Sequence, residues 1–500
     1  MPSTFTHEFN ASAFKGKVSF NTGLFINGQF LDGSDNTTID VINPTNGKMT
    51  TSVSEGTPKD VDLAVDAAQT AFDTIWGLHA PGAQRSILMS KLVALMKKNA
   101  DELAALEALD NGKTFNWARN VDVAGSIDCI RYYAGWADKI TGQVQETTED
   151  KLTYSRHEPI GVVGQIIPWN FPLLMMAWKI GPALACGNTV VLKPSEFTPL
   201  TAIRMCHLIN EAGFPPGVVN VVTGYGNTVG NAISSHMKIE KVAFTGSTLV
   251  GRKIMEAAAK SNLKNVTLEL GGKSPNIIFD DADIEQAVNW AAFGIFWNHG
   301  QTCTAGSRIY VQEGIYDEFF KRFMEKTRSL KVGDPFAPDT FQGPQVSEIQ
   351  FNRIMSYIES GKAAGAKVEI GGERHGSEGY FIKPTIFTNV DPSMKIVQEE
   401  IFGPVCVVIK FKDEEDVIKQ ANDTFYGLAA AVFTQNLNRA INTAHRLRAG
   451  TAWINCVNSF NSNVPFGGFK QSGIGRECGD YALTNYTAVK AVHINLGHRM

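Results

Sequence analysis

Several features that would place this chain in a membrane, secreted or nucleic-acid-binding class are missing from its sequence. No apolar run is long enough to span a bilayer, because Lys179 interrupts the best candidate, Phe171 to Cys186. The 46 lysines and arginines are outnumbered by 50 aspartates and glutamates, which gives a net charge of -4, and there is no basic tract. This balance argues against nucleic acid or a membrane surface as the principal partner and favours small molecules.

Targeting signals and disulfide patterns are missing as well. The N-terminus has no apolar signal core, and the first arginine is Arg85, whereas a mitochondrial presequence is rich in arginine from its start. The seven cysteines are dispersed and include no CxxC pair, so we expect reduced thiols rather than a disulfide framework. We therefore expect a cytoplasmic protein, although a mature form of a processed precursor would have the same features.

The sequence also lacks the spacing of a metal site. It contains no HExxH motif and no pair of cysteines at metal-finger distance. Asp280, Asp281 and Asp283 form an acidic cluster, which we interpret as the cap of a helix that begins near Ile284. No metal is expected.

What the chain does contain is an alternation of β-rich and helix-like segments. Its 500 residues predict at least two domains. Between residues 160 and 280, nearly all-apolar strands are expected at Val162 to Ile167, Thr189 to Leu192, Val218 to Val222, Val242 to Thr245 and Val266 to Leu270. Helical spacing separates them at Met175 to Cys186, Leu200 to Ala212, Thr228 to Ser235 and Leu249 to Ser261. Such an alternation predicts a doubly wound α/β domain with a parallel sheet covered on both faces.

A second alternation between residues 274 and 470 predicts a second α/β domain. Its strands are expected at Ile277 to Phe279, Ile309 to Val311, Val405 to Ile409, Ala429 to Thr434 and Thr451 to Asn455, with helices at Ile315 to Leu330 and Ser347 to Ala364. Two further β-prone segments, Lys151 to Glu158 and Ala488 to Asn495, lie outside both alternations. Exposed strand edges need a partner, so we expect subunit contacts there; ordinary peripheral strands are the alternative.

Cys303 and Glu269 are the strongest indication of chemistry. Cys303 is a lone thiol among small polar residues, in Gly300-Gln301-Thr302-Cys303-Thr304-Ala305-Gly306. Glu269 closes an apolar run and is followed by two glycines, so it is a candidate base for a cysteine nucleophile. The alternatives are a small buried hydrophobic side chain for Cys303 and a strand-end cap for Glu269.

Residues that follow the predicted strands suggest a nucleotide site, because ligands of such sheets bind beyond the carboxyl ends of the strands. Gly246-Ser247 precedes a helix whose free amides favour a pyrophosphate. Gly224-x-Gly226-x-x-x-Gly230 is one residue longer than the usual dinucleotide fingerprint, and a plain glycine-rich turn is as good a reading. Glu196 would accept both ribose hydroxyls of an adenosine and repel a 2'-phosphate, which favours NAD over NADP.

These residues, taken with their flanks, resemble the NAD(P)-dependent aldehyde dehydrogenase superfamily along nearly the whole chain. Within it, the chain is most similar to the broad-specificity cytosolic and mitochondrial class that oxidises acetaldehyde. The motifs that carry the resemblance are the flanks of Cys303 and Glu269, Pro168-Trp169-Asn170-Phe171-Pro172, Lys193-Pro194-Ser195-Glu196, Phe244-Thr245-Gly246-Ser247, Glu399-Glu400-Ile401-Phe402-Gly403-Pro404 and Pro465-Phe466-Gly467-Gly468.

The resemblance implies a domain division and an assembly. It implies an NAD-binding domain (residues 1–140 and 160–271), a catalytic domain (272–472) and a small β oligomerisation element (141–159 and 473–500). It also implies a homo-oligomer, either a tetramer or a dimer.

The resemblance further implies roles for individual residues. Cys303 would attack the aldehyde, Asn170 and the Cys303 N–H would hold the oxyanion, and Glu269 would activate the water that cleaves the thioester. Lys179 and Glu477 would relay protons behind this base. The alternative is that Lys179 is an ordinary lysine on a helix face and Glu477 an ordinary glutamate in a loop. The cofactor would be bound by Ile166, Trp169, Lys193, Glu196, Gly226, Gly246, Ser247, Glu400 and Phe402.

The resemblance also implies an aromatic substrate tunnel, formed by Phe171, Trp178, Trp297, Phe460 and Phe466. Trp297 is larger than the phenylalanine usual in relatives, so we expect a preference for short aldehydes; core aromatics are the alternative reading. Other functions stay open. They are a betaine aldehyde or aminoaldehyde dehydrogenase, a CoA-acylating enzyme, and a structural protein without catalysis, although the retention of Glu269 favours hydrolysis.

Overall fold

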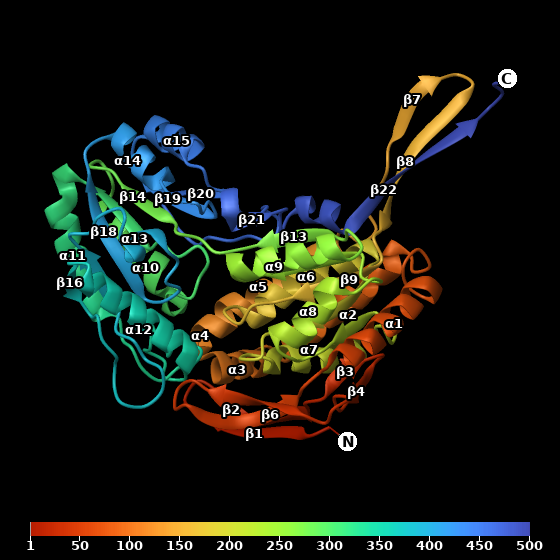
Figure 1. The fold of residues 1–500 in the computed structure, drawn as a ribbon, viewed down its shortest axis with the longest axis horizontal. Helices are drawn as coiled ribbons and strands as arrows, with labels where there is room; N and C mark the ends of the chain where they lie inside the picture. The colour runs from red at the N-terminus through yellow and green to blue at the C-terminus, as the bar shows by residue number, and fades with distance from the viewer. Residues whose placement is uncertain (1) are drawn as a thin grey trace.

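The computed structural model describes residues 2–500 and consists of two α/β units and a projecting β arm (Figure 1). The first unit is built on an eight-stranded sheet in the order β21-β13-β12-β9-β10-β11-β3-β4. Its strands are β3 (Leu24–Ile26), β4 (Gln29–Leu31), β9 (Val162–Ile166), β10 (Thr189–Lys193), β11 (Val219–Val221), β12 (Lys241–Thr245), β13 (Asn265–Glu269) and β21 (Gly473–Ile474). Strands β9 to β13 are all parallel, as their sequence predicted.

Helices cover both faces of this first sheet. Alternate residues of each strand point to opposite faces, so each face has its own hydrophobic core. Val163, Val190 and Leu192 belong to one hydrophobic core, whereas Val162 and Val191 belong to another. The helices of this unit are α1 (Pro58–Thr74), α2 (Gly82–Lys98), α3 (Ala100–Asn111), α4 (Phe115–Trp117), the π-helix η1 (Ala118–Val123), α5 (Ala124–Ala134), α6 (Pro172–Cys186), α7 (Leu200–Ala212), the π-helix η2 (Gly226–Gly230), α8 (Asn231–Ser235) and α9 (Thr248–Lys260). The doubly wound arrangement expected from the sequence is confirmed.

The second unit has a seven-stranded sheet in the order β16-β17-β18-β15-β14-β19-β20, parallel except for β16. Its strands are β14 (Pro275–Ile278), β15 (Arg308–Gln312), β16 (Lys367–Ile370), β17 (Thr385–Thr388), β18 (Val405–Phe411), β19 (Ala429–Phe433) and β20 (Thr451–Ile454). Its helices are α10 (Ile284–Phe296), α11 (Tyr316–Ser329), α12 (Glu348–Ala363), α13 (Lys395–Gln398), α14 (Glu414–Asn422) and α15 (Leu437–Arg446), with short 3-10 turns η3 (Trp297–Gly300), η4 (Glu313–Ile315) and η5 (Lys470–Ser472). A further 3-10 turn, η6 (Asp480–Tyr486), packs against α6 of the first unit. The second α/β alternation is confirmed.

The β arm is a three-stranded antiparallel sheet that projects from the body beside the C-terminus (Figure 1). It consists of β7 (Val144–Thr148), β8 (Lys151–Pro159) and β22 (Thr487–Asn495). The two β-prone segments of the sequence therefore pair with each other along their whole length. Both β7 and β22 keep one unpaired edge within the chain, and their side chains are mostly exposed.

The remaining strands form two hairpins near the N-terminus, and they pack beside α3 and α7 through a shared aromatic core. They are β1 (Thr4–Asn10), β2 (Lys15–Asn21), β5 (Thr38–Asn43) and β6 (Lys48–Ser54). No helix among residues 2–500 has the length and apolar character needed to cross a bilayer.

Candidate active site

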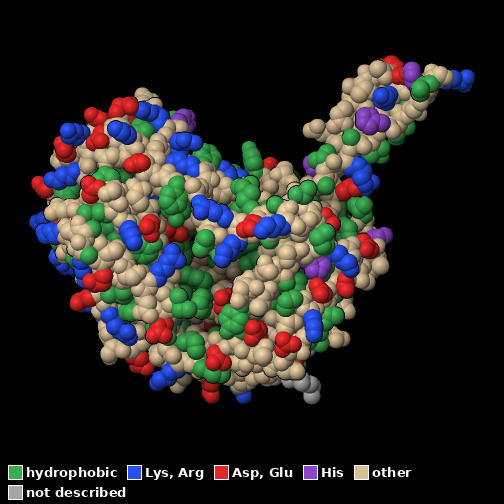
Figure 2. Space-filling view, viewed as in Figure 1, with side chains coloured by type: hydrophobic (Ala, Val, Ile, Leu, Met, Phe, Trp, Pro, Cys, Tyr) green, Lys and Arg blue, Asp and Glu red, His purple; other side chains and the backbone are tan. Residues whose placement is uncertain are grey.

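A cavity of about 650 Å³ is lined by residues of both α/β units. The molecular surface is hollowed between the two lobes (Figure 2). The cavity brings together most of the residues that the sequence singled out, from six separate stretches of chain. These are Trp169, Asn170, Phe171, Trp178, Gly246, Ser247, Glu269, Trp297, Cys303, Glu400, Phe402, Phe460 and Phe466.

The other predicted residues do not line this cavity. Lys193 and Glu196 lie at and beyond the end of β10 and form an ion pair of 3.3 Å. Ile166 is buried at the end of β9, and Gly226 is exposed at the start of η2. All of these positions follow or end strands of the first sheet, on its carboxyl edge.

The remaining pair, Lys179 and Glu477, lies behind the Glu269 carboxylate. Lys179 is fully buried on α6 and forms an ion pair with Glu477. Its ammonium also donates to the Thr245 hydroxyl at 2.6 Å. The second Glu477 oxygen is buried without a hydrogen-bond partner among the described residues. Both side chains act electrostatically on the Glu269 carboxyl group, because the charge of Glu477 raises its pKa and the charge of Lys179 lowers it.

Cys303 and Glu269 share an apolar environment that disfavours charge on either group. Burial, followed by the charge of Glu477, raises the pKa of Glu269 to about 8. Burial and the nearby Glu269 and Glu400 carboxylates raise the pKa of the Cys303 thiol well above its usual value. One Glu269 oxygen is buried without a hydrogen-bond partner in the described chain. In the free protein the site therefore holds a thiol beside a carboxyl group that titrates near neutral pH.

The Asn170 side chain is fixed by the loop that carries Cys303. Its Nδ2 donates to the Gln301 carbonyl at 2.9 Å. That loop turns sharply through three consecutive left-handed residues, Asn298, His299 and Gly300, with φ of 50°, 62° and 70°. Only glycine fits the last position, because a Cβ on Gly300 would lie 2.0 Å from the Gly403 carbonyl oxygen. The tight turn thus places Gln301 against Asn170 and Cys303 in the cavity.

Glu400 approaches the chain between β13 and β14 closely. Its Oε1 accepts a hydrogen bond from the Gly272 N–H at 2.9 Å. A Cβ on Gly271 would lie 2.3 Å from the other Glu400 oxygen, so any larger residue there would push the Glu400 carboxylate out of this position. Neighbouring Glu399 points elsewhere and accepts from the Tyr357 hydroxyl at 2.7 Å. The two acids are therefore not a solvated pair, and burial raises the pKa of Glu400 to about 7.

The five predicted aromatic side chains form two packed groups in the cavity lining, which together we call the aromatic wall. Phe171 lies against Trp297 with ring centroids 5.3 Å apart. Trp178 contacts Phe466 at 5.3 Å, and Phe460 contacts Phe466 at 5.5 Å. These spacings are typical of packed aromatic pairs, and all five side chains also line the cavity. The aromatic side chains of the wall thus pack against one another and also form part of the cavity surface.

Sequence reasoning missed one segment of the cavity lining. The π-helix η1 and the start of α5 contribute Asn120, Val121, Ala124, Gly125 and Asp128 to the lining. Phe293 and Trp290 of α10 and Arg353 of α12 were missed as well. The available signal was the run of aromatic and small residues from Phe115 to Gly135, which lies outside both α/β alternations.

The acidic cluster near residue 280 has ordinary structural partners. Asp283 caps α10 by accepting a hydrogen bond from the Gln286 N–H at 3.1 Å, as the sequence predicted. Asp280 and Asp281 pair with Arg439. Across the described residues, no three His, Cys, Asp or Glu side chains gather as a metal-binding group. All seven cysteines are free.

The two parallel α/β sheets, with a cysteine and a carboxyl group in a shared cavity, define an enzyme of the α/β class. Comparison with known proteins gives its family. The Aldehyde dehydrogenase family matches residues 30–492, and the chain belongs to that family. An aldehyde dehydrogenase of Agaricus bisporus is 70% identical over 500 residues, which is 100% of both chains.

Two further relatives extend this comparison. Aldehyde dehydrogenase 1A1 of Gallus gallus is 53% identical over 95% of this chain and 94% of its own. Among solved structures, an NAD+ complex of an aldehyde dehydrogenase from Bacillus cereus has a TM-score of 0.94 and 50% identity, and covers 95% of this chain and 97% of the other. The protein is thus an oxidoreductase of the aldehyde dehydrogenase family.

Proposed function

We propose that the enzyme oxidises short aliphatic aldehydes, such as acetaldehyde, to carboxylic acids with NAD. The observation that supports this proposal is the single cavity that holds Cys303, Glu269 and Asn170 beside the carboxyl edge of the first sheet. A nucleophile, a base and a hydrogen-bond donor for developing negative charge are the groups that acyl chemistry at an aldehyde carbon needs.

The residues at this edge fit a dinucleotide. The N-terminus of α9 begins at Ser247 and supplies free amides for a pyrophosphate, with Gly246 before it. Lys193 and Glu196 present an ammonium and a carboxylate beyond β10, where ribose hydroxyls would bind, and the negative charge of Glu196 disfavours a 2'-phosphate. Glu400 and Phe402 would hold the nicotinamide ribose and ring, with Ile166, Trp169 and Gly226 completing the site. The relative from Bacillus cereus, which was solved with NAD+, supports this choice of cofactor.

Acylation begins at the Cys303 thiol. The raised pKa values of the thiol and of Glu269 mean that the thiol proton is removed as the sulfur attacks, with the Glu269 carboxylate as acceptor. Attack on the carbonyl carbon gives a thiohemiacetal whose oxygen is negatively charged. The Asn170 amide has two N–H groups, and only one is used, by the Gln301 carbonyl, among the described residues. The second is left to hold this oxyanion together with the Cys303 N–H.

Deacylation depends on Glu269. When bound, NAD supplies the acceptor for the hydride that leaves the thiohemiacetal carbon, which converts it to a thioester. Glu269 first gives up the proton that it took from the thiol and then removes a proton from water. The hydroxyl adds to the thioester carbon, and the Cys303 sulfur leaves to give the carboxylic acid. Lys179 and Glu477 lie behind the base and would carry both protons away from it. If mutation of either leaves the pH dependence of deacylation unchanged, that relay is wrong.

The aromatic wall favours small apolar substrates. Trp297 packs against Phe171 and Phe293 and narrows the approach to Cys303. One observation favours a second candidate, an aminoaldehyde or betaine aldehyde, because Asp128 adds a carboxylate to an aromatic cavity. Arg131 already pairs with Asp128, at 2.5 Å, and weakens its attraction for a cationic substrate.

The projecting β arm and the division into units support the remaining proposals. We assign cofactor binding to the first unit, catalysis to the second, and self-association to the arm. The free edges of β7 and β22 are exposed and carry apolar side chains, among them Val144 and Val489 at 66% and 67% exposure. These features favour a homo-oligomer, either a dimer or a tetramer.

Steady-state assays of the purified protein test the proposal. We expect NADH and acetate from acetaldehyde, lower efficiency with NADP and with long or aromatic aldehydes, and no turnover in Cys303→Ala. Equal efficiency for short and long aldehydes would contradict the substrate preference. Faster turnover of betaine aldehyde would favour the second candidate. Acyl-CoA formed on addition of CoA would show that the thioester is released to CoA rather than to water.

A further inference from the structure

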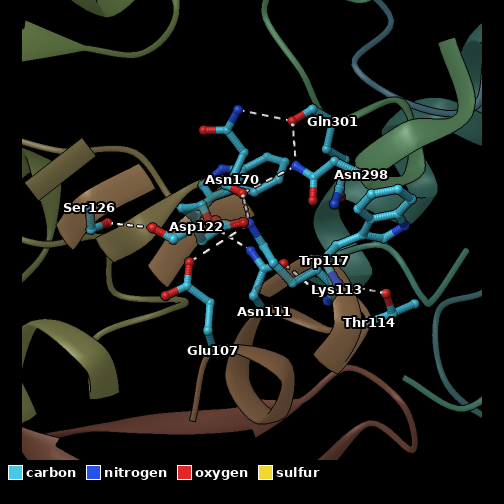
Figure 3. Close-up of polar contacts among 11 residues, drawn as sticks. Glu107, Asn111, Lys113, Thr114, Trp117, Asp122, Ser126, Asn170, Asn298 and Gln301 are labelled. Atoms are coloured by element: carbon cyan, nitrogen blue, oxygen red, sulfur yellow. Dashed lines mark hydrogen bonds and ion pairs between the residues drawn. The ribbon is translucent and has the colours of Figure 1, made fainter. Parts of the chain in front are cut away.

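A buried charge cluster lies directly behind Asn170, outside the cavity (Figure 3). We call Glu107, Lys113 and Asp122 the Lys113 cluster. All three side chains are at most 1% exposed. The Lys113 ammonium forms an ion pair with Asp122 and lies 3.7 Å from Glu107. Burying three ionisable side chains is costly unless each is paired or neutral, so a stability role alone is a weak explanation.

The cluster contacts the backbone that carries Asn170. Lys113 Nζ donates to the Asn170 carbonyl at 2.9 Å, and Asn111 Nδ2 donates to the Trp169 carbonyl at 2.6 Å. The turn at the end of α3 therefore binds the carbonyl groups of two successive residues, Trp169 and Asn170 (Figure 3). Gly112 makes this turn possible, because its φ is 86° and a Cβ would lie 2.8 Å from Pro44 and Pro344.

Asp122 is the ion-pair partner of Lys113 within the cluster. Burial and the adjacent Asp122 raise the pKa of Glu107 well above its usual value, which favours the neutral form of that carboxyl group. Asp122 lies in the π-helix η1, whose neighbouring residue Val121 lines the cavity. Two successive residues of this π-helix thus have different surroundings, since Val121 lines the cavity and Asp122 contacts Lys113.

The same ammonium lies over the ring of Phe171, 4.2 Å from its centroid. It therefore contacts both Asn170 and the next residue, on the side away from the cavity. On the cavity side, Asn170 is held by the Gln301 carbonyl. Asn298 Nδ2 donates to the Asn170 carbonyl at 3.2 Å, so Lys113 and the Cys303 loop meet at one oxygen.

We propose that Lys113 is a positioning residue for acylation, which holds Asn170 by its carbonyl and Phe171 by its ring so that the Asn170 amide faces the oxyanion. This proposal rests on the proposed function, because it assigns Asn170 that role. Misplacing a catalytic group by about 1 Å lowers the reaction rate on the order of 100-fold. Lys113 would thus affect catalysis without touching the substrate.

A double-mutant cycle between Lys113→Met and Asn170→Ala tests the proposal. The readout is the single-turnover rate of NADH formation. We expect Asn170→Ala to cost about 10²- to 10³-fold and Lys113→Met about 10- to 100-fold. Added to Asn170→Ala, Lys113→Met should cost no more than about twofold. The KM for NAD should stay within about twofold, since a global structural defect would change both constants.

The cycle has a matched control and a second readout. Lys264→Met removes another buried lysine, which donates to the Ser234 carbonyl and the Ser261 hydroxyl, and should lower the Tm without changing the rate. Hydrolysis of p-nitrophenyl acetate needs the thiol and the oxyanion donor but no cofactor. The cycle repeated with this ester therefore still tests Lys113 if aldehyde oxidation itself fails. If Lys113→Met does not fold, Lys113→Met with Asp122→Asn replaces it, because the pair then carries no charge.

The outcomes separate the two proposals. No effect of Asn170→Ala on either reaction would contradict the proposed role of Asn170, and with it the role of Lys113. A normal loss in Asn170→Ala, with Lys113→Met costing nothing or the same factor in both backgrounds, would overturn the positioning role alone.

Discussion

At the scale of single residues, the position of Glu269 decides how the chemistry responds to pH. Its carboxyl group lies at the end of β13, where burial and the charge of Glu477 both favour the protonated form. A base must lose its proton before it can accept one from water. The same burial that makes Glu269 a strong base therefore limits the fraction that is active at neutral pH.

This position predicts the pH dependence of deacylation. Because the pKa of Glu269 is about 8, the active fraction rises with pH and levels off above that value. We expect the single-turnover deacylation rate to increase from pH 6 to pH 9 with a midpoint near the pKa. Glu269→Gln should lower the rate by about 10²- to 10⁴-fold and abolish this dependence. A rate that falls with pH in the wild-type protein would contradict the assignment.

Gly271 provides a second prediction at this scale. Alanine there would place a methyl group 2.3 Å from Glu400 and displace that carboxylate from its bond with the Gly272 N–H. We expect Gly271→Ala to raise the KM for NAD roughly 10- to 100-fold, as for a lost hydrogen bond to a charged group. Gly314→Ala, where the nearest atom is 3.8 Å away, serves as the control in the same titration. An unchanged KM in Gly271→Ala would argue against a cofactor role for Glu400.

At the scale of elements, the sequence predicted those that repeat a simple physical pattern. The strands β9, β10 and β12 are buried along their whole length because both faces of the parallel sheet are covered, and their apolar sequences made them visible. The strand β17, directly after Pro384, was not predicted. The π-helix η1 has no sequence period of its own, so the cavity lining that it supplies could not be predicted.

The helix α10 offers a prediction at the element scale, since it leads into the turn before Cys303. Its N-cap is Asp283, which accepts from the Gln286 N–H. Asp283→Ala should cost about 1 kcal/mol of stability because that amide loses its partner. Asp283→Asn keeps an accepting oxygen and should be near neutral. Chemical denaturation of both variants measures the difference, and equal loss in the two would show that the charge, not the cap, matters.

At the scale of the whole molecule, the cavity depends on contacts that no local pattern encodes. Cys303 and Glu269 were recognised from their flanks, whereas Lys179 and Glu477 were placed behind Glu269 only through the family resemblance, because their closeness depends on the packing of α6 against the C-terminal segment. The Lys113 cluster was not predicted at all. Its three side chains come from α3, the turn after it and a π-helix, which meet only in the folded chain.

The exposed β arm predicts self-association. Val489 lies on β22, an edge strand, and is 67% exposed. Val489→Lys places a charge on that edge and should shift the protein toward smaller species in sedimentation velocity. Leu437→Lys changes an equally exposed residue, at 69%, on α15 and is the control. A wild-type protein that sediments as a monomer at all concentrations would contradict the proposed role of the arm.

A single-turnover experiment with Glu269→Gln tests the central claim, covalent catalysis at Cys303, most directly. Acetaldehyde and NAD are mixed with this variant, and NADH is followed while the quenched protein is mapped by mass spectrometry. The account predicts about one NADH per active site, formed more slowly than in the wild-type protein because the thiol has lost its proton acceptor, and an acetyl group on the peptide that contains Cys303. Steady turnover at the wild-type rate without an acylated Cys303 would contradict it.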